Sequence, residues 1–400
     1  MVEAVNAKAK AQTHSVLEET VNLFYRLDEQ ISEVLRPFCK RWARFILPGL
    51  VSASEETRER SFSVLSKYKD DLCQASDLSK HLTKAITSGL AQSLKCLMTK
   101  HEIYAMKTWA LVIEICGKEF HKGPSINSML EVIEIGFKSN PQAKREAFIA
   151  WRSLISNFGL DKNVISDTKR IKLSMMVFRY DNARTESVAI EKMLTWWHFV
   201  LNIRPKLMVN FEKIVYPMLQ FCVGNSKTRT ALKASTNLPS IAVSPQTRNA
   251  PELPACPALQ KLGLEAVALL LSKPSASDAS GVTWTLEHLQ SEAFGGPASF
   301  AKHASFLLNI IHHVVKNGNP DETLVLYTWV TLAGHIKAAM ESSAKSEMRD
   351  IFSTFLTDLH SMVEDKAFKG ETLFKMTEVC NTFPVKVLAS TAFNVRSTVR

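Results

Sequence analysis

Apolar positions recur with the spacing of an amphipathic α-helix along almost the whole chain, and residues 140–203 show it most clearly. This stretch opens with Asn140-Pro141, a typical helix start because proline is tolerated at the first helical position. Apolar residues then follow at helical intervals: Phe148, Trp151, Ile155 and Phe158. The pattern predicts a helix that ends near Gly159 and buries this stripe in the core, so we expect the aromatic rings to serve packing and not base stacking.

A short basic helix and a long apolar helix are predicted next. Residues 169–173 hold three basic side chains beside Ile171 and Leu173, which can pack inward. The following helix has two adjacent apolar stripes: Ile190, Leu194, Trp197 and Leu201 in one, and Met193, Trp196, Val200 and Ile203 in the other. A helix that is apolar over two stripes is covered from two directions, as an inner helix of a stack is.

The rest of the chain continues as predicted helices in pairs. They cover residues 14–35 and 38–47, 55–72 and 77–99, 102–120 and 125–137, 211–223, 259–271, 284–290, 300–316 and 321–340, and 343–364 and 371–380. Asp77 is the expected N-cap of its helix. The first helices of the first five pairs are expected near residues 14, 55, 103, 141 and 183, at spacings of 41, 48, 38 and 42. This period, with strand signals nearly absent, predicts an all-α, HEAT- or armadillo-like solenoid of helical hairpins.

Composition divides the chain into three parts. Residues 1–223 are predicted to be basic helical repeats, residues 224–257 a disordered insertion rich in proline and serine, and residues 258–400 a continuation of the repeats. Ser244-Pro245 within the insertion fits proline-directed phosphorylation, although isolated pairs of this kind are common.

Positive charge is concentrated in one region. The formal net charge is +10, and residues 140–180 contain eight basic residues against three acidic ones, Glu146, Asp161 and Asp167. The basic residues are Lys144, Arg145, Arg152, Lys162, Lys169, Arg170, Lys172 and Arg179. The excess favours a polyanionic partner such as DNA or a phosphorylated peptide, and an ordinary solvated surface is the alternative. We take six of them as candidate DNA- or phosphate-binding residues: Lys144, Arg145, Arg152, Lys169, Arg170 and Lys172.

Signatures of catalysis, metal binding and membrane insertion are missing from the sequence. It has no phosphate-binding glycine loop, no zinc-protease motif and no nucleophile elbow. The seven cysteines stand apart, which predicts reduced thiols, and His312-His313 point in directions about 100° apart on a helix. We expect no cofactor, no metal, no membrane contact and no enzymatic activity, in a cytosolic or nuclear chain.

Several segments together resemble the telomere-associated Rif (Rap-interacting factor) family of animals. They are residues 120–130, 145–158, 169–173, 191–197 and 384–388. The resemblance implies the N-terminal HEAT-type domain of a nuclear, chromosome-bound scaffold that acts at telomeres, in double-strand-break repair and in replication timing. It further implies DNA and a phosphorylated damage-response adaptor as partners.

The resemblance does not extend to the phosphatase contact of the family. Residues 213–216 are the nearest match to a docking motif for protein phosphatase one, and their apolar members are expected to face the core, so that contact is expected to lie outside this chain. A different class of function also remains open, namely a protein-binding adaptor whose apolar grooves take partner helices without contact to nucleic acid.

Overall fold

The computed structural model describes residues 2–178, 183–223, 256–272, 281–317, 320–342, 345–364, 367–381 and 383. Within these ranges the chain consists of helices and connecting segments and contains no strand, which confirms the all-α prediction. The chain forms two compact units, residues 1–174 and 175–400. The predicted divisions at 223 and 257 rest on charge and composition and stay a prediction, since residues 224–255 lie outside the described residues.

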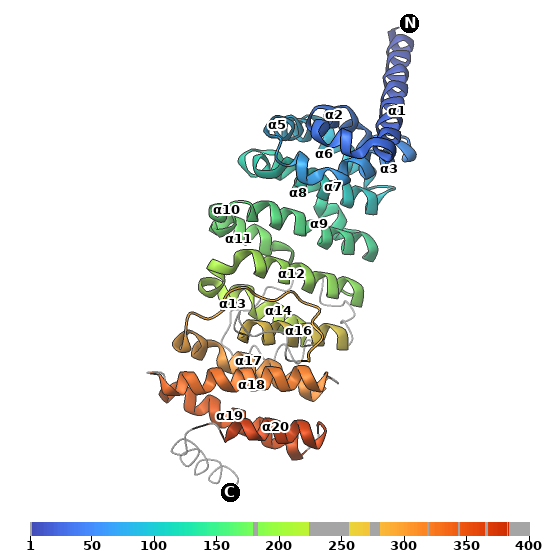
Figure 1. The fold of residues 1–400 in the computed structure, drawn as a ribbon. Helices are drawn as coiled ribbons and strands as arrows, with labels where there is room; N and C mark the ends of the chain where they lie inside the picture. Colours follow the sequence, from blue (N-terminus) through green and yellow to red (C-terminus); the bar gives the residue numbers. More distant parts are fainter. Residues whose placement is uncertain are drawn as a thin grey trace. The chain divides into compact units, whose positions relative to one another are not determined.

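Unit 1 is built from helices stacked in two layers (Figure 1). In one layer α7 packs along α9, and in the other α6 packs on α8. Its helices are α1 (Val2–Leu35), α2 (Cys39–Ile46), α3 (Glu55–Lys67), α4 (Lys69–Leu72), α5 (Ser76–Ala85), α6 (Ala91–Leu97), α7 (Glu102–Cys116), α8 (Ser125–Lys138), α9 (Pro141–Gly159), α10 (Lys162–Ser166) and α11 (Thr168–Met175). The paired arrangement confirms the prediction of helical hairpins.

The start of α9 has the predicted form. Asn140 is the N-cap and its Oδ1 accepts a hydrogen bond from Ala143 N at 2.9 Å, while Pro141 takes the first helical position. The four stripe residues beginning with Phe148 are all fully buried, which confirms their role in the core.

Two details of the second helical pair differ from prediction. Helix α5 begins at Ser76 and its N-cap is Ala75, so the prediction that Asp77 caps it is wrong. The start is set by packing instead, because buried Ser79 donates through Oγ to Ile115 O at 3.2 Å and thereby joins α5 to α7. The single helix predicted over 77–99 is interrupted by a π-helical turn, Ile86–Leu90, which separates α5 from α6.

Unit 2 is also built from helices stacked in two layers. Its helices are α12 (Glu186–Leu207), α13 (Phe211–Ile214), α14 (Tyr216–Cys222), α16 (Pro257–Leu271), α17 (Pro297–Asn317), α18 (Glu322–Glu341), α19 (Lys345–Glu364) and α20 (Gly370–Cys380). Helices α12, α16, α18 and α20 form one layer, and α14, α17 and α19 the other. Because α14 packs directly on α16, the stack is continuous across residues 224–255.

The helix predicted over residues 284–290 is absent, and that prediction is wrong. Residues 281–296 form an irregular segment that lies against the unit 2 helices. Glu265, fully buried on α16, accepts hydrogen bonds from Thr285 N at 2.8 Å and Leu286 N at 3.0 Å. Trp197 Nε1 donates to Glu287 O at 2.8 Å. These contacts fix the backbone of residues 285–287 against α16 and α12, so tertiary contacts and not a local helical period set the conformation of this segment.

Helices α17 and α19 are joined by a pair that makes stability depend on pH. His312 Nδ1 lies 3.0 Å from Asp358 Oδ1, and the hydrogen bond to this carboxylate raises the pKa of His312. The folded chain therefore binds this proton more tightly than the unfolded chain, so the stabilisation is complete below about pH 6.5 and is lost as the pH rises through the folded pKa. The pKa of neighbouring His313 is shifted in the opposite direction, because burial lowers it.

We expect His312→Gln to cost up to about 1 kcal/mol of unfolding free energy at pH 5.5 and less at pH 8. Urea denaturation of the full chain at the two pH values measures this difference. His360→Gln, which breaks an exposed pair with Glu364, is the control and should have little effect at either pH. A loss for His312→Gln that grows as the pH rises would contradict the assignment.

Candidate nucleic-acid interface

The basic helix predicted over residues 169–173 is α11, and its start is fixed by a side-chain cap. Asp167 Oδ1 accepts hydrogen bonds from Lys169 N at 2.8 Å and Arg170 N at 3.2 Å. Asp161 has the same role at α10, where it accepts from Asn163 N at 2.8 Å. Two of the three acidic residues of this region are therefore engaged by backbone amides at helix starts.

Three lysines project from these two helices into solvent. Lys162 on α10 and Lys169 and Lys172 on α11 are exposed, and none of them has an ion-pair partner among the described residues. We call these three residues the α10–α11 basic surface. Because none of the three lysines is held in an ion pair there, their ammonium groups are available to an external anion.

Arg170 was predicted as a phosphate ligand, but it is directed inward. Its Nη2 donates to His121 O at 3.2 Å, and its guanidinium lies 5.2 Å from the centre of the Phe158 ring. The residue is half-buried and joins α11 to the end of α9. This geometry supports a structural role for Arg170.

The other three predicted residues lie on α9, apart from the α10–α11 basic surface. Arg145 and Arg152 lie on its narrow solvent-facing strip and Lys144 lies at the edge of that strip. Arg145 Nη1 is 3.8 Å from Glu146 Oε1, and all three basic residues are engaged in interactions within the protein. Helix α11 contacts α9 at Trp151 and at Phe158, and Arg145 is about 20 Å along the helix from Phe158. The lysines of α10 and α11 thus differ from the α9 residues in having no ion-pair partner among the described residues; Arg179 lies outside the described residues.

A second basic region, on α2, was not predicted from the sequence. Residues 34–54 contain four basic residues and no acidic one, and this charge excess is the sequence signal for the region. Three of these residues, Lys40, Arg41 and Arg44, lie on the exposed face of α2 together with Phe45.

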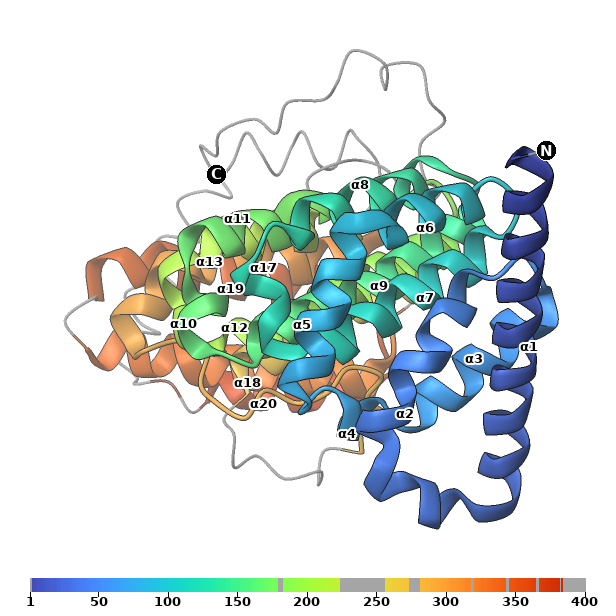
Figure 2. The same cartoon turned by 90° about the horizontal axis from the view of Figure 1, so that it is seen from above.

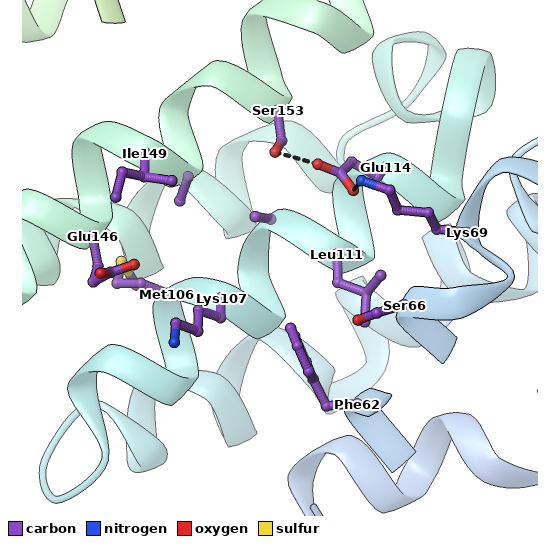
Figure 3. Close-up of a pocket in the computed structure, with 12 residues that line it drawn as sticks. Phe62, Ser66, Lys69, Met106, Lys107, Leu111, Glu114, Glu146, Ile149 and Ser153 are labelled. Carbon is purple, nitrogen blue, oxygen red and sulfur yellow. Dashed lines mark hydrogen bonds and ion pairs between the residues drawn. The ribbon is translucent and has the colours of Figure 1, made fainter. Parts of the chain in front are cut away.

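An open groove of about 230 Å³ crosses α3, α7 and α9 within unit 1 (Figure 3). Its centre is apolar, with Phe62, Leu111 and Ile149 among the lining residues. At one end Glu114 accepts hydrogen bonds from Lys69 Nζ at 2.8 Å and from Ser153 Oγ at 2.6 Å. The hydrogen bond to Glu114 raises the pKa of Lys69, so this end of the groove holds a paired and partly exposed charge.

Lys107 and Glu146 lie at the other end of the groove. The hydroxyl of Ser66, which also lines the groove, is buried without a hydrogen-bond partner. The groove therefore combines an apolar floor with polar groups at its ends, as a site for a peptide segment does.

The remaining candidate motifs are buried in the core or form no site among the described residues. Ile214, Val215 and Tyr216 of the segment resembling a phosphatase-docking motif are buried, which confirms that its apolar residues face inward. In the part of the chain that the structure describes, no group of three or more His, Cys, Asp or Glu residues is placed to hold a metal ion. No helix within that part is both long and apolar enough to cross a membrane.

Stacked antiparallel helical pairs, with an exposed basic surface and an apolar groove in unit 1, define a helical-repeat protein of the HEAT or armadillo class. Residues 1–215 match the family described as Rap1-interacting factor 1 N terminal, and the chain belongs to this family.

Curated relatives extend the match beyond residue 215. The telomere-associated protein RIF1 of Homo sapiens is 30% identical over 96% of this chain and 17% of its own length. The Gallus gallus protein of the same name is 28% identical over 98% of this chain and 18% of its own length. In Drosophila melanogaster the match is 29% identical over 33% of this chain and 9% of that protein. The chain thus spans less than a fifth of the length of these relatives, whose names describe association with telomeres and no catalysed reaction.

Proposed function

We propose that this chain is a non-enzymatic module of a Rif-type scaffold that binds chromosomes in the nucleus, including their telomeric regions, and that it contacts DNA through the α10–α11 basic surface. The observation that carries the proposal is the exposure of Lys162, Lys169 and Lys172 beside carboxylates that are engaged as helix caps. Roles of the whole scaffold in double-strand-break repair and replication timing belong to the same proposal, and recruitment of protein phosphatase one is assigned to regions outside this chain.

Three lysines near phosphates give affinity that depends strongly on salt. Each neutralised phosphate contributes a slope of about −0.9 in log K against log salt, so three contribute about −2.7. Between 50 and 200 mM salt the contribution of this surface should therefore fall about 40-fold. A phosphorylated peptide of the damage-response adaptor would use the same lysines, because its phosphate offers the same oxygen acceptors.

Charge neutralisation tests the proposal. Binding of the full chain to a 20-base-pair duplex is measured by fluorescence anisotropy between 50 and 200 mM salt, for wild type and for the triple variant Lys162/Lys169/Lys172→Gln. We expect the variant to bind at least tenfold more weakly at 50 mM salt and its salt slope to be smaller by about 3. Arg170 is left intact because its substitution would also disturb the contact between α11 and α9.

A matched control removes the same charge elsewhere. The triple variant Lys80/Lys84/Lys213→Gln changes three exposed lysines on α5 and α13 and should retain most of the affinity. Equal losses for the two triple variants would assign the binding to net charge and reject the α10–α11 basic surface as a site.

The groove of unit 1 favours a second candidate function, a protein-binding adaptor. Its apolar floor suits a partner side chain, and binding there would depend little on salt. Ala110→Trp would fill the groove. Three results together would favour this function over the first. Ala110→Trp would abolish binding of a partner protein, that binding would depend little on salt, and the wild type would not bind DNA.

A further inference from the structure

Helix α2 holds one rigid, outward-facing surface on unit 1. Its inner face is anchored by Trp42, whose ring stacks on Phe24 at 5.2 Å and whose Nε1 donates to Leu35 O at 3.1 Å. The four inner residues of the helix, Cys39, Trp42, Ala43 and Ile46, are all buried. The opposite face therefore has a fixed direction, and it lies in a different part of unit 1 from α10 and α11 (Figures 1 and 2).

This outward face carries positive charge with no internal neutralisation. Lys40, Arg41 and Arg44 are exposed, and among the described residues none of the three has an ion-pair partner. Lys40 and Arg44 are four positions apart, so these like charges are neighbours on the helix surface and repel one another. Nearby Arg36 differs, because its Nη1 is paired with Asp71 Oδ2 at 2.9 Å. A bound polyanion would relieve the repulsion.

Two aromatic rings flank the charges and remain in solvent. Phe38 is 51% exposed and Phe45 is 52% exposed, although Phe is among the residue types most often buried. The guanidinium of Arg44 lies 4.8 Å from the centre of the Phe45 ring, so a planar cation and an aromatic face are presented together. Phe38 directly precedes α2 and Phe45 is near its end, so the Cα atoms of the two phenylalanines are separated by about 10 Å along the helix axis.

We propose that the α2 surface, made of Phe38, Lys40, Arg41, Arg44 and Phe45, binds single-stranded nucleic acid. The three cations would follow the backbone phosphates, and the rings would stack on unpaired bases. A spacing of about 10 Å corresponds to about three nucleotides of a stacked strand. The site is separate from the α10–α11 basic surface of the proposed function, and neither proposal depends on the other.

The exposed rings distinguish the kind of polyanion. The bases of a duplex are stacked on one another, so a duplex would use the three cations and leave both rings unused. An anionic membrane would engage both charge and rings, but membrane-surface helices present a long apolar face to the lipid, and the apolar face of α2 is buried in unit 1. Unpaired bases satisfy both features of the surface.

Fluorescence anisotropy with three probes tests the proposal on the full chain. The probes are a labelled 12-nucleotide deoxythymidine strand, an abasic strand of the same length and a 12-base-pair duplex. We expect Phe38→Ala/Phe45→Ala to weaken binding of the thymidine strand at least tenfold and to leave binding of the other two probes unchanged. Lys40/Arg41/Arg44→Gln should weaken binding of all three probes and reduce the salt slope for the thymidine strand by about 2, as expected for three single-strand phosphates.

Two further measurements complete the test. The thermal midpoints of both α2 variants should be no lower than that of the wild type because the substituted side chains are exposed. The variant Phe38→Leu/Phe45→Leu separates ring stacking from simple apolar contact. The Lys162/Lys169/Lys172→Gln variant should keep its affinity for the thymidine strand, which distinguishes failure here from failure of the proposed function. Equal binding of abasic and thymidine strands, full retention of affinity by Phe38→Ala/Phe45→Ala, or stronger binding to phosphatidylserine vesicles than to the strand would overturn the proposal.

Discussion

Replacing Trp151 with alanine is expected to lower the unfolding free energy of unit 1 by about 5 kcal/mol. Loss of a fully buried indole costs about 3 to 5 kcal/mol through lost transfer energy and the cavity that remains. In addition, Trp151 Nε1 donates to Ser174 O at 3.1 Å, and an unsatisfied buried carbonyl costs about 1 to 3 kcal/mol. The bond joins α9 to α11, so α11 should also lose protection against hydrogen exchange.

Chemical denaturation of the full chain, with hydrogen exchange followed on peptides from α9 and α11, measures both effects. Trp151→Phe keeps most of the ring packing against Phe137, loses the hydrogen bond and should cost about 1 to 2 kcal/mol. An alanine variant that loses less than about 1 kcal/mol, with α11 still protected, would show that this tryptophan does not hold the two helices together.

Glu265→Ala is expected to cost about 3 to 5 kcal/mol and to release residues 281–296 from unit 2. The carboxylate has no solvent exposure and accepts from two backbone amides and from Thr285 Oγ1, while Lys261 Nζ is 3.9 Å away. Its removal leaves the buried amide of Leu286 and the partly buried amide of Thr285 without their acceptor, and an unsatisfied buried donor costs stability.

Hydrogen exchange of residues 281–296 distinguishes this local effect from global destabilisation. Glu265→Gln retains an acceptor oxygen and should lose less than half as much stability as the alanine variant. If the amides of Thr285 and Leu286 remain protected in Glu265→Ala, the irregular segment must be held by other contacts, such as the one from Trp197 to Glu287 O.

The local sequence was sufficient to predict helix starts and buried stripes, because interactions between neighbouring residues decide them. The Asn140-Pro141 start of α9 and the apolar stripe from Phe148 to Phe158 were predicted because caps and a 3.6-residue period act within one helix. Asp321 caps α18 by the same chemistry, accepting from Thr323 N at 2.8 Å.

The candidate site was predictable only in part, because charge counts do not say where side chains point. Lys169 and Lys172 are exposed as expected, whereas Arg170 between them bonds to His121 O, 49 residues earlier in the chain. Lys192 shows the same limit, since it is 2% exposed and its Nζ lies 4.5 Å from the centre of the Phe221 ring. A long cationic side chain can turn toward a carbonyl or an aromatic ring that only the folded chain brings near.

By itself, the sequence determined that this protein is all-α, where most helices begin and end, which stripes are buried and in which region basic residues accumulate. These properties depend on neighbours within about four positions, and such neighbours are visible in the sequence. Only the tertiary structure decided that residues 284–290 stay irregular, that Arg170 faces inward and that Phe38 and Phe45 remain in solvent beside three unpaired cations. Each of these outcomes is set by groups on other helices, and no local period encodes where those groups lie.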